Sequence, residues 1–194
     1  IIVAIIVVTD TATNVTTVPA TTADGVGSMF RFLETIWRIA LLRAGPQDLP
    51  GGGSAPTISI AMYTGIVVIS GLADERATGI SDLFVSIVVP LVAAGSILGL
   101  RRVTARFNQT IAALFGTGAL ISLVNLPLWF SAQTPLPAPL VMLALVALFW
   151  SLAVDGHVWR NALNCSFAGG LMVAVLILFL QMLVFQAMGN PGVS

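Results

Sequence analysis

The sequence predicts an all-α membrane protein, a polytopic transmembrane helix bundle with five spans and an N-terminal interfacial amphipathic helix. Hydrophobic residues make up 57% of the 194 residues and charged residues only 8%, and the mean hydropathy is +1.01. A soluble domain of this length could not bury so much apolar surface. The chain also contains five uncharged apolar runs near the roughly 17 to 25 residues that cross a hydrocarbon core. These runs are continuously apolar, whereas the strands of a membrane β-barrel alternate apolar and polar residues. The spans are therefore expected to be helices.

The five predicted spans together form a transmembrane domain over residues 57–188. Pro90 lies inside the second span and predicts a kink, and Pro127 lies near the outer end of the third. The spans cover residues 57–73, 83–100, 110–132, 139–154 and 167–188.

The stretch MFRFLETIWRIALLRAG, residues 29–45, predicts the interfacial helix. At about 100° per residue, Arg31, Glu34 and Arg38 share one face and the apolar side chains share the other. The helix is expected to end near Gly45, which is followed by proline. Such a helix would lie in the membrane interface, although the same apolar face could also pack on the other helices, and both can hold. The apolar face comprises Phe30, Leu33, Ile36, Trp37, Ala40 and Leu41.

Residues 1–28 form a Thr-rich N-terminal extension. Its apolar start, IIVAIIVV, is too short to span a bilayer and has no preceding basic region. We expect translation to start naturally at Met29, with the preceding residues upstream of the native protein. The alternative is a genuine extension whose apolar end inserts as an additional partial helix.

The arginines predict the orientation, because basic residues flank the cytoplasmic ends of spans. The segment before the first span, the second loop and the fourth loop are arginine-bearing, whereas the first loop holds three acids against Arg76 and the third is uncharged. This alternation places the N-terminal helix in the cytoplasm and the C-terminus in the periplasm. A chain without lysine and rich in Ala, Gly and Leu is typical of a bacterial inner-membrane protein.

Small residues at four-residue spacing predict close helix packing, mainly within one chain rather than between copies. The predicted packing positions are Gly95 and Gly99, Ala112 and Gly116, Gly118 and Ser122, and Gly170 and Ala174.

The segment DGHVWRNALN, residues 155–164, is the most polar stretch beside a predicted span. Asp155, His157 and Arg160 could form a proton or anion gate. The favoured interpretation is a cytoplasmic loop whose charges mark the membrane boundary. Because none of the predicted spans contains an ionisable residue, an ion-coupled transporter is the less favoured function.

The sequence contains no motif that predicts catalysis. A phosphate loop, a nucleophile elbow and a pair of histidines at metal-binding spacing are all missing. We therefore expect a protein that is not an enzyme and that binds no metal and no cofactor. The eight basic residues balance the eight acidic ones, so nucleic acid is not expected as a partner.

The order of an interfacial helix, five spans and the segments RFNQTIAALFGTGALISLVNLPL and ALFWSLAVDGHVWRNAL resembles the Yip-type five-span membrane proteins. For eukaryotic relatives this resemblance implies membrane-trafficking scaffolds that bind small GTPases. Here the N-terminal segment is too short for such a domain. We therefore predict a non-enzymatic scaffold or accessory subunit, in contact with membrane lipids and with other integral membrane proteins or further copies of itself. The alternative is a small transporter or channel, which a polar cavity at mid-membrane would favour.

Overall fold

The computed structural model describes residues 22–73, 80–129 and 137–189, and every regular element in these ranges is helical. Five of the helices are long and apolar enough to cross a membrane, which confirms the predicted fold class. The predictions made for residues 1–21 and for the loops around Arg76 and Thr134 lie outside the described residues. The elements are α1 (Thr22–Ala40), η1 (Pro46–Asp48), α2 (Ser54–Ala73), α3 (Ile80–Leu100), η2 (Thr104–Arg106), α4 (Phe107–Val124), α5 (Leu126–Trp129), α6 (Ala138–Leu163) and α7 (Phe167–Gly189).

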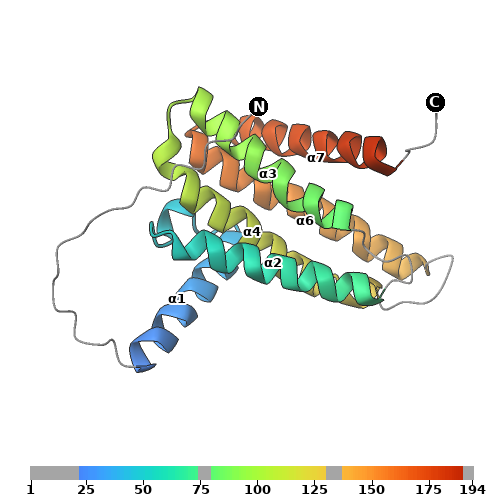
Figure 1. Ribbon diagram of the computed structural model, residues 1–194, viewed down its shortest axis with the longest axis horizontal. Helices are drawn as coiled ribbons and strands as arrows, with labels where there is room; N and C mark the ends of the chain where they lie inside the picture. The colour runs from blue at the N-terminus through green and yellow to red at the C-terminus, as the bar shows by residue number, and fades with distance from the viewer. Residues whose placement is uncertain (1–21, 74–79, 130–136, 190–194) are drawn as a thin grey trace.

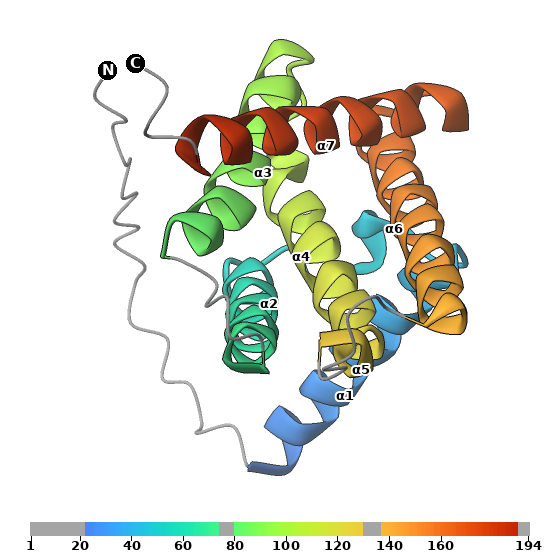
Figure 2. The same ribbon diagram turned by 90° about the vertical axis from the view of Figure 1, so that its right-hand side faces the viewer.

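Helix α4 is the centre of the bundle. Figures 1 and 2 show it surrounded by other helices, and it contacts α1, α2, α3 and α6. Of the span that contains α4, 44% is buried, against 6 to 17% for the other four spans. Small side chains such as Ala112, Ala113 and Ala119 allow this central position, because they let neighbouring backbones approach closely.

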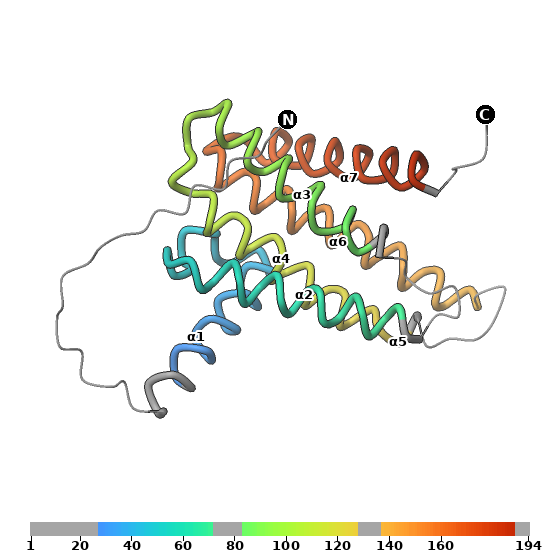
Figure 3. The backbone as a smooth tube through the Cα atoms, in the orientation of Figure 1, coloured from blue at the N-terminus to red at the C-terminus, as the bar shows by residue number. Residues whose placement is uncertain are grey.

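The arginine-bearing connections gather at one end of the bundle, which we call the arginine end. The start of α2, the link between α3 and α4 and the turn between α6 and α7 all lie at this end, on the left in Figure 1. The link between α3 and α4 carries Arg101, Arg102 and Arg106, and the last turn of α6 carries Arg160. The tube in Figure 3 shows α1 approaching the bundle obliquely before the chain turns back toward α2.

Helix α1 has three faces rather than two. Phe32, Ile36 and Ile39 are almost completely buried and belong to the core that α1 shares with α2, α4 and α6. A second apolar face, which includes Leu33 and Trp37, is exposed. The charged side chains occupy the third face and are also exposed. Of the predicted apolar face, Ile36 and Ala40 therefore pack on the bundle, whereas Phe30, Leu33 and Trp37 are exposed.

Both ends of α1 differ from the sequence prediction. The helix begins at Thr22, within the predicted N-terminal extension, and not at Met29. The helix ends at Ala40, and Leu42 rather than Gly45 adopts the left-handed conformation, with φ of 61°. The amides of Leu42 and Arg43 donate to the carbonyls of Ile39 and Arg38, which is the Schellman pattern. Gly45 is extended instead, and its amide donates to the Asp48 carboxylate at 2.8 Å.

The fourth span is longer than predicted. The segment 155–163 was expected to be a loop, but α6 continues without interruption to Leu163. Val154, Val158 and Ala162 recur at four-residue spacing and are buried, so the polar residues between them are carried on a helix that packs well.

The third span is shorter than predicted, because α4 ends at Val124. Pro127 has no N–H to donate to the Leu123 carbonyl, so the hydrogen-bond ladder of α4 cannot continue through it, and Pro127 lies instead in the first turn of the short α5.

Candidate functional site

A polar cavity that is partly open to the surface lies between α2, α3, α4, α6 and α7. Its volume is about 270 Å³, which gives room for several water molecules but not for a large ligand. Apolar residues make up most of the wall, and each of the five helices contributes one or two polar side chains. The polar residues are Tyr63, Ser86, Ser122, Ser151, Asp155 and Gln181. We call this space the interior cavity.

Asp155 is the ionisable residue of greatest interest in this cavity. It lies on the face of α6 that also carries Ser151 and Trp159, and this face points toward α7 and α4. Among the residues that the structure describes, the Asp155 carboxyl forms neither an ion pair nor a hydrogen bond. An acidic side chain inside a membrane bundle usually has such a partner, and it marks a functional site by default. The expectation that no span carries an ionisable residue is therefore wrong.

The cavity lies near the middle of the bundle. Asp155 is eight residues before Leu163, the last residue of α6, which corresponds to about 12 Å along the helix. Gln181 is fourteen residues after Phe167, the first residue of α7, or about 21 Å. The two polar groups therefore lie about 12 and about 21 Å along their helices, measured from the arginine end.

Tyr63 closes one side of the cavity. Its ring meets Phe115 edge to face, with the ring centroids 5.4 Å apart and the planes at 76°. Its hydroxyl is within hydrogen-bonding reach of Ser86 and close enough to Asp155 to interact electrostatically. The Ser86 hydroxyl donates to the Leu83 carbonyl at 2.9 Å.

His157 lies on the opposite side of α6 from Asp155 and has a different role. Its Nε2 atom is 2.9 Å from the carbonyl oxygen of Ala44, in the segment that follows α1. On the same side of α6, the indole nitrogen of Trp150 donates to the carbonyl of Ala40 at 3.1 Å. The amide of Asn161, one turn further on, donates to the His157 carbonyl at 2.8 Å. These contacts tie the end of α1 to α6.

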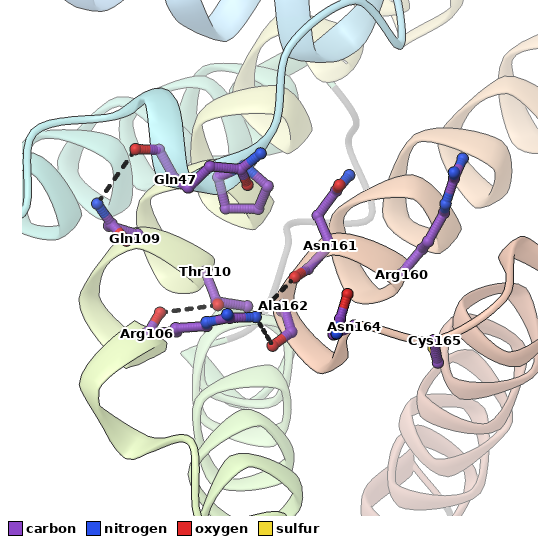
Figure 4. A pocket seen from close by; sticks show the side chains of 10 residues that line it. Gln47, Arg106, Gln109, Thr110, Arg160, Asn161, Ala162, Asn164 and Cys165 are labelled. Carbon is purple, nitrogen blue, oxygen red and sulfur yellow. Dashed lines mark hydrogen bonds between the residues drawn. The ribbon is translucent and has the colours of Figure 1, made fainter.

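Arg160 lies at a third place, on the rim of a second pocket at the arginine end. Figure 4 shows this pocket, in which Arg106 reaches across from the start of α4 to the end of α6. Asp155, His157 and Arg160, which were predicted as one cluster, therefore belong to three separate surroundings. Only Asp155 faces the interior cavity.

The small residues differ in what surrounds them. A Cβ atom on Gly116 would collide with Ile36 of α1, and one on Gly118 would lie 3.4 Å from the Tyr63 ring. Gly170 faces Gly156 and Arg160 of α6 at backbone distance. By contrast, a Cβ on Gly99 would meet nothing within 4 Å, and one on Gly95 would only touch Phe107 at 3.8 Å.

The remaining predicted packing residues lie on the inner side of the bundle. Ala112 is completely buried, and its carbonyl accepts a hydrogen bond from Ser59 of α2 at 2.8 Å. Ala174 is buried and lines the interior cavity, as does the half-buried Ser122. Leu41, predicted for the interfacial helix, lies just past α1 and lines an apolar crevice against α4 and α6 with Trp37.

Sequence reasoning did not identify the hydroxyl groups around the cavity. Tyr63 is the single tyrosine of the chain and lies in an otherwise apolar span, which is a usable signal. Ser86 and Ser151 carry no such signal, because isolated serines are frequent in transmembrane helices. Among the described residues, no group of three or more His, Cys, Asp and Glu side chains could hold a metal ion.

Comparisons with protein families, with curated proteins and with solved structures give no match to this chain.

Proposed function

We propose that this protein is a small membrane transport protein whose interior cavity binds a proton or a monovalent cation at Asp155. The observation that carries this proposal is a carboxyl that has no ion pair and no hydrogen bond among the described residues, in a cavity with room for water between the spanning helices. An ionised carboxylate in such surroundings needs a cation or water to compensate its charge. Tyr63, Ser86, Ser151 and Gln181 supply the oxygen atoms that could replace part of a hydration shell.

The proposed orientation follows the distribution of arginine. The arginine end faces the cytoplasm and the C-terminus faces the periplasm of a bacterial inner membrane. In this arrangement a cation that enters from the periplasmic side meets Gln181 first and Asp155 later. The resident groups are side chains of the protein, so the proposed transport requires neither a cofactor nor an enzymatic reaction.

The experiment is a flux measurement on purified protein in liposomes. Proton and Na⁺ entry are followed with entrapped fluorescent indicators under an imposed membrane potential. We expect faster entry than in empty liposomes, and Asp155→Asn should abolish the difference because the amide keeps the size but loses the charge. Glu34→Gln is the matched control, since Glu34 is an exposed acid on α1. Wild-type liposomes as tight as empty ones for both ions would refute the proposal.

A second candidate function is that of a scaffold or accessory subunit of a membrane complex, to which the resemblance to Yip-type proteins also points. The outward faces of α1 and α3 favour it. Leu33 and Trp37 are exposed, and so are Gly95 and Gly99 on α3, where a Cβ on Gly99 would meet no described residue within 4 Å. Small residues of this kind allow a further helix to approach closely. Gly95→Leu should then release a co-purifying membrane protein while ion flux stays unchanged.

A further inference from the structure

The second pocket lies at the arginine end of the bundle, apart from the interior cavity, and we call it the arginine-end pocket. It has a volume of about 420 Å³ and is built from three parts of the chain: η1, the start of α4, and the end of α6 with the turn after it. The polar side chains that shape it include Gln47, Arg106, Gln109, Arg160, Asn161 and Asn164.

The pocket is lined by hydrogen-bond donors and positive charge. Two guanidinium groups and several carboxamides face it, and the described residues that line it include no Asp or Glu. A carboxylate would neutralise the arginines from within the protein. Its absence from the lining leaves the positive charge available to an anion from outside, and guanidinium groups favour phosphate oxygens through paired N–H donors.

Arg106 is held in place by the protein itself. Its Nη1 atom donates to the carbonyls of Asn161 and Ala162, both at 3.0 Å, so it satisfies the C-terminal carbonyls of α6. A guanidinium has five N–H donors, and the Nε and Nη2 donors of Arg106 have no partner among the described residues. Figure 4 shows this side chain lying flat between α4 and α6. The remaining donors are thereby fixed in position before any ligand binds.

The position of the pocket identifies the source of the anion. It lies at the end of the spanning helices, where α2 begins and where α6 turns into α7, and lipid headgroups occupy this level in a bilayer. Exposed Arg101 and Arg102 at the end of α3 add positive charge nearby. Basic pockets between helices at this depth suit anionic headgroups.

We infer that the arginine-end pocket binds a phosphate group, supplied by the headgroup of an anionic phospholipid. The fixed Arg106 meets the phosphate from the floor of the pocket. Arg160 is exposed and stands at the rim, from where its long side chain closes on the ligand. The site is independent of the proposed transport function, because neither arginine lines the interior cavity.

The test measures lipid binding to the purified full chain in mild detergent by native mass spectrometry. Phosphatidylglycerol is compared with zwitterionic phosphatidylcholine, and in a separate arm inorganic phosphate is compared with chloride by thermal unfolding. Arg160→Gln should weaken phosphatidylglycerol binding by about tenfold, as expected for the loss of one charge-assisted contact. The matched control is Arg101→Gln with Arg102→Gln, which removes two exposed arginines outside the pocket lining. This control should keep most of the affinity.

Arg106→Gln also removes hydrogen bonds to α6 and can lower stability, so Arg160→Gln is the deciding variant. If phosphatidylglycerol binds more tightly than phosphatidylcholine and only the pocket variant loses that preference, the inference holds. If inorganic phosphate stabilises the protein but the two lipids bind equally, a phosphate site is supported and a lipid source is refuted. Equal behaviour of the pocket variant and the control in both arms overturns the site.

Discussion

The contact between α6 and α7 provides a sharp test of the structure, because it depends on glycine. Gly170 at the start of α7 faces the backbone of α6. A Cβ atom added to Gly170 would collide with the carbonyl oxygen of Gly156, and it would lie 2.6 Å from the amide nitrogen and 3.1 Å from the Cα atom of Arg160. These are backbone atoms, so no side-chain rotation can relieve the overlap. Gly170→Ala must push the two helices apart.

The expected loss of stability follows from the energetic cost of overpacking a helix contact. Forcing one extra carbon into a well-packed contact destabilises by about 1 to 3 kcal/mol. For a chain of this length, each 1 kcal/mol lowers the melting temperature by about 2 to 4 °C. We therefore expect the Gly170→Ala protein to melt about 2 to 12 °C below wild type. Trp159 of α6 is buried beside this contact, so the interior cavity should loosen with it.

The assay is thermal unfolding in one detergent, followed by near-UV circular dichroism and by tryptophan fluorescence. Gly65→Ala is the matched control, because Gly65 lies within α2 and a Cβ there would meet nothing within 4 Å. The control should melt at the wild-type temperature or slightly above it, since alanine favours helix. If Gly170→Ala were as stable as Gly65→Ala, the close approach of α6 and α7 would be refuted.

Three further predictions concern α1 and the orientation. Ile36→Ala should lower the free energy of unfolding by about 2 to 5 kcal/mol and Leu33→Ala by less than about 0.5, because only Ile36 is buried; equal losses would contradict the three-faced helix. His157→Ala removes the hydrogen bond to the Ala44 carbonyl, worth about 1 kcal/mol, and should speed hydrogen exchange in the segment after α1; unchanged exchange would argue against that tie. In a variant without the native cysteine, a cysteine introduced by Thr104→Cys should not react with impermeant thiol reagents in intact cells. Labelling of this cysteine would contradict the predicted orientation.

Periodicity and composition were sufficient to predict the five spans, because crossing a bilayer requires long apolar runs whatever the tertiary contacts are. The boundary of α6 was misjudged because Asp155, His157 and Arg160 suggest a loop when only polarity is considered. Val154 and Val158, which lie next to these polar residues, are buried at the four-residue spacing of a helix, and their packing keeps the segment helical. The end of α1 was missed for a different reason. Leu42 adopts a conformation that leucine avoids, so no sequence rule would select it.

The interior cavity could not be predicted, since each helix contributes only one or two polar residues and none of them forms a local motif. Ser86 and Gln181 are far apart in the sequence, and only the packing of α3 and α7 brings them to one space. The small residues illustrate the same limit. Gly99 and Gly170 look equivalent in the sequence, but one faces outward and the other forms the tightest helix contact, and helix orientation alone decides this.

The central position of α4 has a consequence for how the chain is made. Synthesis delivers α4 to the bilayer before α6 and α7 exist, yet its span has a mean hydropathy of 1.4, against 2.5 for α7. Arg106 finds its carbonyl partners only once α6 has arrived. Helix α6 therefore completes the packing around the third span, and a chain released before α6 is made has a central helix that still lacks one of its packing partners.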